Sequence, residues 1–152
     1  GKTRRLLRSV GLGQMGFSFP AAMGAKLAHP DVPALVMTGD GDFTMVMQDL
    51  ETAVRRNLAV VVVVFNDFSM GAVRHFQKNQ HGGRYIGVEH NNPDFAEMAK
   101  LFGAHGERVE DPARLRPALE EAFASGKPAV LDVIIDRDET PKSVRAFYQK
   151  FK

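Results

Sequence analysis

Short apolar runs of strand length alternate along this chain with longer segments in which apolar residues recur every three or four positions. The clearest run is AVVVVVF at residues 59–65, and similar runs predict strands at 34–38 and 129–135. A weaker pattern predicts a fourth strand near residues 105–109. Helical spacing that stops near Gly, Asn or Pro predicts helices over 20–27, 44–56, 93–102 and 112–125. Parallel strands covered on both faces read as continuous apolar runs. We therefore predict an α/β fold, a three-layer doubly wound parallel sheet with helices on both faces.

The composition is that of an ordinary folded domain. Of the 152 residues, 44% are hydrophobic, which is enough to bury one core. We assign residues 1–136 to this domain and residues 137–152 to a charged C-terminal tail. The net charge is only +2 and the basic residues are scattered, so we expect no nucleic-acid partner.

Two compositional features bear on the compartment of the protein. The chain has no cysteine, which excludes a disulfide framework and a cysteine zinc site. Its longest apolar run, residues 59–65, is too short to cross a bilayer, and residues 1–10 lack the apolar core of a signal peptide. We expect a cytoplasmic protein with no membrane partner.

A polar stretch at residues 77–93 is longer than an ordinary connection between elements. It contains three glycines, two histidines and three asparagines, and we predict a loop or lid there. His81 and His90 lie in this stretch and could contact a substrate, although loop histidines more often have no such role.

Acidic residues follow two of the predicted strands at the point where each strand ends. Gly39-Asp40-Gly41-Asp42 comes directly after residues 34–38, and Asn66-Asp67 comes directly after residues 59–65. Loops at the carboxyl ends of parallel strands form the ligand-binding crevice of an open sheet. Glycines let the backbone approach a phosphate, and magnesium prefers oxygen ligands that include substrate phosphates. The pattern predicts a magnesium and diphosphate site.

The spacing of these two motifs resembles the signature of thiamine diphosphate (ThDP) enzymes. Gly39-Asp40-Gly41 is followed by residues 42–65 and then by Asn66-Asp67, and the resemblance extends to residues 11–22 and 92–95. The chain looks like the C-terminal, diphosphate-binding (PP) domain of the acetolactate synthase and 2-keto acid decarboxylase branch. This resemblance implies ThDP and Mg²⁺ as cofactors. It also implies a small 2-keto acid as substrate of a lyase or transferase.

The resemblance implies three magnesium ligands in this chain. They are the side chains of Asp40 and Asp67 and the backbone carbonyl of Ser69. The family more often has asparagine at the position of Asp67, so this site carries an additional negative charge if Asp67 is ionised. An aspartate oxygen still ligates a hard cation, and metal binding should survive.

The resemblance also implies further contacts with the cofactor. Gly41 and Asp42 would meet the diphosphate through their backbone, and Met70-Gly71 would open the next helix beside the phosphates. Gly13 would present its carbonyl to the aminopyrimidine ring, and Met15 would support the bent form of the cofactor. No catalytic residue is assigned within this chain.

The resemblance implies that other parts of the enzyme are needed for turnover. In the family, a glutamate of a separate pyrimidine-binding (PYR) domain promotes formation of the reactive ylide, and the sequence contains no such domain. We also expect that the usual first strand of the PP domain is missing before Gly1. We expect a fragment or one subunit of a split enzyme, inactive alone and completed by a PYR domain within a homo- or hetero-oligomer.

Two alternatives to this interpretation stay open, and a third is excluded. Gly11, Gly13 and Gly16 also match a Rossmann dinucleotide motif, but residues 3–10 are too basic for the buried strand that must precede it. A non-catalytic scaffold domain is the other alternative. A calcium loop that starts at Asp40 is excluded, because Met45 stands where such a loop needs glycine.

Overall fold

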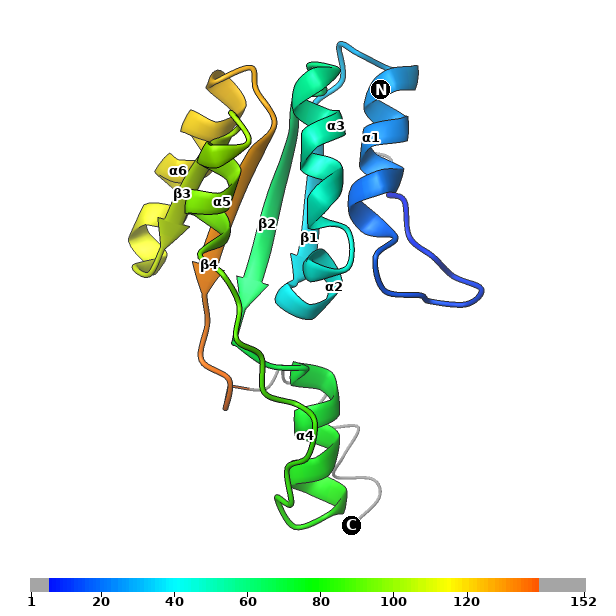
Figure 1. The fold of residues 1–152 in the computed structure, drawn as a ribbon, viewed down its shortest axis with the longest axis vertical. Helices are drawn as coiled ribbons and strands as arrows, with labels where there is room; N and C mark the ends of the chain where they lie inside the picture. Colours follow the sequence, from blue (N-terminus) through cyan, green and yellow to red (C-terminus); the bar gives the residue numbers. More distant parts are fainter. Residues whose placement is uncertain (1–5, 140–152) are drawn as a thin grey trace.

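A sheet of four parallel strands lies at the centre of the computed structural model, which describes residues 6–139 (Figure 1). The strand order is β1-β2-β4-β3, and every pair of neighbours is parallel. The bounds are Ala34–Gly39 for β1, Val60–Asn66 for β2, His105–Val109 for β3 and Ala129–Ile134 for β4. The four predicted strands are confirmed, each within one residue at either end.

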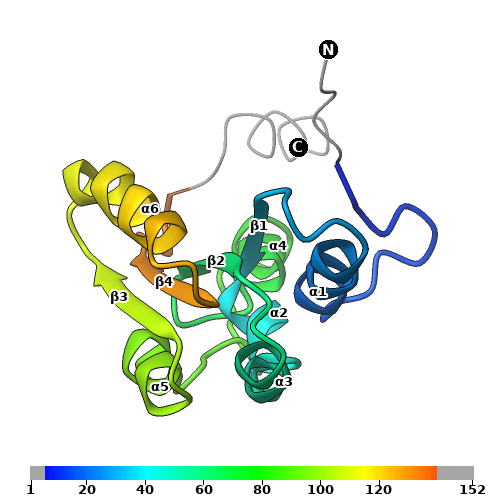
Figure 2. The ribbon, with the colours of Figure 1, turned by 90° about the horizontal axis from the view of Figure 1, so that it is seen from above.

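Helices cover both faces of the sheet. Figure 2 shows α3 (Leu50–Arg55) and α5 (Phe95–Leu101) on one side and α6 (Leu115–Ala124) on the other. On the side of α3 and α5, α1 (Ser18–Ala28) and α2 (Asp40–Thr44) complete the same apolar core. The predicted three-layer α/β fold is confirmed.

The run of valines in β2 is explained by its position between β1 and β4. Val60, Val62 and Val64 belong to the core beneath α3 and α5, whereas Val61 and Val63 pack in the core beneath α6. All five valines are at most 4% exposed, because successive side chains of a strand point to opposite faces and both faces are covered.

The helix predicted over residues 44–56 is divided in the structure. The chain becomes helical at Asp40 in α2, and a 3-10 turn at Met47–Asp49 precedes α3. The periodic pattern continued through this break because Phe43, Leu50 and Ala53 all face the same core. The prediction was correct about the buried face and wrong about the continuity of the helix.

The other helices differ from the predictions in where they begin and end, in helix type, or in replacing a predicted loop. A 3-10 turn at Pro112–Arg114 forms the start of the helix predicted over 112–125. Residues 77–80 were predicted as loop but complete α4 (Gly71–Gln80), and the irregular stretch begins after them. Helix α4 extends away from the sheet (Figure 1), so its sequence lacks a broad apolar face.

No helix within residues 6–139 is long and apolar enough to cross a membrane. Most of the predicted tail, residues 140–152, lies outside the described range, as do residues 1–5.

Candidate functional site

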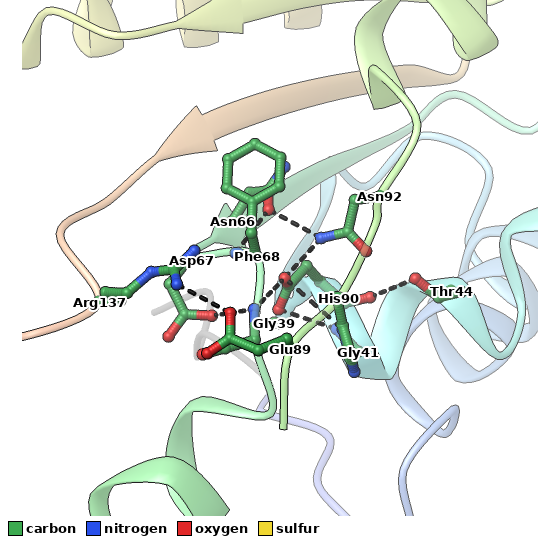
Figure 3. A network of polar contacts seen from close by, with 12 residues as sticks. Gly39, Gly41, Thr44, Asn66, Asp67, Phe68, Glu89, His90, Asn92 and Arg137 are labelled. Atoms are coloured by element: carbon green, nitrogen blue, oxygen red, sulfur yellow. Dashed lines mark hydrogen bonds and ion pairs between the residues drawn. The ribbon is translucent and has the colours of Figure 1, made fainter. Parts of the chain in front are cut away.

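Two buried carboxylates meet at the edge of the sheet where β1 and β2 end. Asp40 directly follows β1 and Asp67 directly follows β2, and their side chains belong to residues that are only 3% and 7% exposed. The backbone N–H of Ser69 donates to both: its nitrogen lies 3.2 Å from Asp40 Oδ2 and 2.9 Å from Asp67 Oδ1. The predicted pair of acids is thus assembled on one rim, the edge of the sheet at which β1 and β2 end. Figure 3 shows Asp67 at this rim, together with Gly41 and Asn92.

The turn after β2 is held by side-chain and backbone hydrogen bonds. Phe68 adopts a left-handed backbone conformation with φ of 55°, and its N–H donates to Asn66 Oδ1 at 3.1 Å. Ser69 forms an antiparallel bridge with Glu89, in which Met70 N–H donates to the Val88 carbonyl and His90 N–H donates to the Phe68 carbonyl. These two bonds use the neighbours of Ser69, so the bridge occupies neither its N–H nor its carbonyl.

Asp40 is surrounded by hydrogen-bond donors rather than by a strong cation. Asn92 Nδ2 lies 2.6 Å from Asp40 Oδ2, the Gly41 N–H donates to Oδ1 at 2.9 Å, and His90 Nδ1 is 3.9 Å away. Burial raises the pKa of Asp40 above its ordinary value, the bonds from Asn92 and Gly41 oppose this increase, and the charge of Asp67 adds to it. A pocket of this kind favours an added positive charge.

Two glycines at the rim leave no room for a side chain. A Cβ at Gly41 would lie 2.9 Å from both His90 Cε1 and Met70 Sδ, and a Cβ at Gly71 would lie 2.6 Å from Asp67 Oδ2. The chain therefore approaches the carboxylates closely at these positions because glycine has no Cβ. Both glycines were predicted site residues.

The remaining predicted residues lie beside the rim in a surface groove. Gly13, Met15 and Asp42 all line this groove. Met15 also reaches the rim, since its Cε is 3.5 Å from the position of a Cβ on Gly41. The Asp42 carboxylate accepts hydrogen bonds from Gly16 N–H and Thr38 Oγ1, which attach the glycine-rich segment to the end of β1.

The two histidines of the predicted lid have different positions. His90 contacts the rim, whereas His81 ends α4 and stacks edgewise on Phe76 with ring centroids 5.4 Å apart. Helix α4 begins at the rim and points away from it, so His81 lies at the distant end. A role for His81 at the rim is not supported.

Three residues near the rim were not singled out from the sequence for the bonds they make. Asn92 donates a hydrogen bond to Asp40, and Asn66 accepts one from the Phe68 N–H in the turn after β2. Asp132, within β4, accepts a hydrogen bond from Asn66. Asp132 could have been noticed as the one charged residue in an otherwise apolar strand. The contact of Asn92 depends on how the loop folds back, which local sequence does not reveal.

The donor atoms suit a hard cation that brings further ligands of its own. Within residues 6–139, no three His, Asp or Glu side chains gather into a cluster that could hold a metal. The buried carboxylates of Asp40 and Asp67 supply oxygen ligands, and the bridge with Glu89 leaves the carbonyl of Ser69 unused. Magnesium commonly binds through one or two carboxylates and completes its shell with phosphates and water, so these residues fit a magnesium diphosphate.

The structure does not support the Rossmann alternative. A dinucleotide motif needs a strand directly before its first glycine, and residues 6–17 form neither strand nor helix. The motif glycines therefore do not join a strand to a helix.

Comparison with known proteins identifies the family. Residues 1–133 match the family described as thiamine pyrophosphate enzyme, C-terminal TPP binding domain. The chain belongs to this family. Thiamine pyrophosphate is another name for ThDP, and the enzymes of this family use it with Mg²⁺. The resemblance found in the sequence and its implied cofactors are thus confirmed at the level of the family.

The relatives of this TPP binding domain are much longer proteins. The acetolactate synthase large subunit of Haemophilus influenzae is 38% identical over 138 residues, which cover 90% of this chain and 24% of that protein. The mitochondrial acetolactate synthase catalytic subunit of Aspergillus candidus is 38% identical over 134 residues, or 88% of this chain and 19% of that protein. This chain therefore spans about a fifth to a quarter of these relatives.

A solved structure has the same fold. The ThDP-dependent 4-hydroxybenzoylformate decarboxylase of Rhodococcus jostii RHA1 matches with a TM-score of 0.77 and 31% identity. The match covers 84% of this chain and 24% of the decarboxylase. The parallel sheet and its helices are thus those of a ThDP-enzyme domain.

Proposed function

We propose that this domain binds the diphosphate end of ThDP through a Mg²⁺ ion held by Asp40, Asp67 and the Ser69 carbonyl. The observation that carries this proposal is the convergence of both carboxylates on the N–H of Ser69, at the edge formed by β1 and β2. Among residues 6–139, these two buried acids have no cationic partner at salt-bridge distance other than His90, which favours a divalent ion between them.

The glycines and α4 supply the side of the site that faces the phosphates. The close approach at Gly41 and Gly71 leaves backbone rather than side chain at the rim. Helix α4 begins at Gly71, and no side chain in residues 6–139 caps its amino end, so its first N–H groups are available to an anion. Met15 and Gly13 line the adjoining groove, where the organic part of the cofactor would lie.

The proposed task of this domain is to anchor and orient the cofactor. ThDP would supply the carbanion that adds to a 2-keto acid and accepts the electrons released on decarboxylation. Asp40 and Asp67 would fix the metal, and the metal would neutralise the diphosphate and fix the position of the ring. We propose a partner PYR domain, from the same enzyme or another subunit, that completes an acetolactate synthase-like or decarboxylase active site in an oligomer.

Calorimetric titration of the full-length protein with ThDP, with and without Mg²⁺, tests this proposal. We expect binding that requires the metal. Asp40→Ala should weaken it about 100-fold or more, because removing one member of a buried charged contact costs roughly 3 kcal/mol or more. Asp31→Ala, in the exposed turn between α1 and β1, is the matched control and should bind like the wild type.

The outcomes of the titration are distinct. Normal affinity in Asp40→Ala would show that the metal is placed wrongly. A wild-type protein that binds no ThDP would favour the scaffold alternative, and NAD binding without metal would favour a dinucleotide site.

A further inference from the structure

A buried aspartate in β4 lies behind the rim. Asp132 is 0% exposed, and it pairs in register with Val64 of β2 and Arg108 of β3. Val64 and Val130 both belong to the core beneath α3 and α5, so Asp132 points to that same face. A carboxylate in this position needs a specific partner, because burying an uncompensated charge is costly.

The partner of Asp132 is Asn66, at the end of β2. Asn66 Nδ2 donates to Asp132 Oδ1 at 2.9 Å. The amide oxygen of Asn66 therefore faces the turn, where it accepts from Phe68 N–H at 3.1 Å and from Asn92 Nδ2 at 2.9 Å. The orientation of this single amide thus decides whether the turn after β2 finds its acceptor.

Asn92 extends the chain of hydrogen bonds to the rim. Its Nδ2 carries two hydrogens, and the structure gives it two acceptors: Asn66 Oδ1 and, at 2.6 Å, Asp40 Oδ2. If the Asn66 amide were reversed, its NH₂ group would face the NH₂ group of Asn92 and the N–H of Phe68. The hydrogen bonds that lead from Asp132 in β4 through Asn66 and Asn92 to Asp40 can therefore form with only one orientation of the Asn66 amide.

Asp132 is the residue that can fix the orientation of the Asn66 amide. An ionised carboxylate only accepts hydrogen bonds, whereas an asparagine amide can be turned either way. The second oxygen, Asp132 Oδ2, lies 4.0 Å from the Arg108 guanidinium and has no hydrogen-bond partner among residues 6–139. Burial raises the pKa of Asp132, while the bond from Asn66, the charge of Arg108 and the nearby Phe95 amide oppose the increase.

We propose that Asp132 is a positioning residue that orients Asn66 and, through Asn92 and the turn after β2, presents Asp40 and Ser69 at the rim. Its effect on cofactor binding rests on the proposed function. The hydrogen-bonded arrangement of the rim itself does not depend on any ligand.

Hydrogen–deuterium exchange of the full chain without cofactor tests the ordering directly. In Asp132→Asn, the positive charge of Arg108 favours the orientation in which the new amide turns its NH₂ group toward Asn66. The Asn66 amide must then turn over to accept this hydrogen bond, so its oxygen no longer faces Phe68 and Asn92. We expect exchange of the backbone peptide over residues 66–70 to become about tenfold faster, as lost buried hydrogen bonds imply. Val130→Ala is the matched control, since it weakens the same face of β4 without touching Asn66.

A compensating exchange of side chains provides the rescue. In Asn66→Asp combined with Asp132→Asn, the new amide in β4 can donate to the new carboxylate, which still accepts from Phe68 and Asn92. We expect exchange over residues 66–70 to return to within about threefold of wild type. Equal acceleration in Val130→Ala and Asp132→Asn, or no acceleration in Asp132→Asn, would overturn the proposal.

Titration with magnesium and ThDP then separates this inference from the proposed function. If the wild type binds, Asp132→Asn should bind about tenfold more weakly and Val130→Ala about as well as wild type. Unchanged affinity in Asp132→Asn would contradict its effect on the rim. If the wild type does not bind, the proposed function fails, and the exchange experiment alone decides the role of Asp132.

Discussion

At the scale of single residues, one methyl group added at Gly41 should disturb the rim. A Cβ there would lie 2.9 Å from both Met70 Sδ and His90 Cε1. Both are side-chain atoms, so the fold can adjust, but they would be displaced into the space beside Asp40. We expect Gly41→Ala to lower the affinity for Mg²⁺ and ThDP at least about tenfold while costing only about 1–2 kcal/mol of unfolding free energy. Calorimetry and urea denaturation measure the two effects.

Gly24 offers a control for this substitution. It lies within α1, and no atom is within 4 Å of a Cβ added there. Gly24→Ala should stabilise the fold by about 0.5–1 kcal/mol, because alanine loses less conformational entropy in a helix. Its cofactor affinity should equal that of wild type. A Gly41→Ala protein with the same affinity would show that close backbone approach is not needed.

The residues of the rim differ in how far the sequence alone could predict them. Asp40 and Asp67 could be paired because each directly follows an apolar run, and adjacent parallel strands end at one edge. Asn92 could not be paired with Asp40, since its contact depends on the return of a long irregular segment. The charge of Asp132 in an apolar strand was visible, but its partner depends on the order β2-β4, which skips β3.

At the scale of elements, α5 packs closely against β3 at Gly106. A Cβ on Gly106 would lie 2.1 Å from the Ala96 carbonyl oxygen and 2.9 Å from its carbon. These are backbone atoms, so α5 as a whole would have to move. We expect Gly106→Ala to lower the unfolding free energy by about 1–3 kcal/mol or more in urea denaturation. Wild-type stability in this variant would mean that α5 does not pack on β3 as closely as described.

The elements themselves were predictable to different degrees for a physical reason. Strands β2 and β4 are almost fully buried and read as apolar runs, whereas β3 is only partly buried and gives a weaker pattern. The ends of α1 and α5 follow local signals. The break between α2 and α3 was hidden because the buried face continues across it. Helix α4, whose start at Met70-Gly71 only the family resemblance implied, shows no clear apolar pattern because most of it projects beyond the sheet, where few of its residues need to be apolar.

At the scale of the whole molecule, α4 projects away from the sheet. Ion pairs connect α4 and the segment that follows it to two residues after β4. Arg137 pairs with Glu89 at 2.9 Å, and Asp138 pairs with Arg74 at 3.0 Å and with Lys78 at 2.9 Å. Arg74 is the buried member of this group, and its guanidinium also lies over the Tyr85 ring. The segment that follows β4 therefore helps to hold the helix that begins at the rim.

The acid stability of this connection follows from the titration of Asp138. Hydrogen bonds from Lys78 and Arg74 lower the pKa of Asp138 from its ordinary value of 3.8 to about 2. A carboxyl whose pKa is lower in the folded state stabilises the fold above its unfolded pKa, and this contribution disappears as the pH falls from about 3.8 to about 2. Asp138→Asn should therefore melt at a lower temperature than wild type near pH 6, and the two melting temperatures should converge toward pH 2. Asp31→Asn, which removes an equal charge from an exposed turn, should show no such convergence. A difference between Asp138→Asn and wild type that stays constant from pH 6 to pH 2 would mean that Asp138 does not hold α4 through its charge.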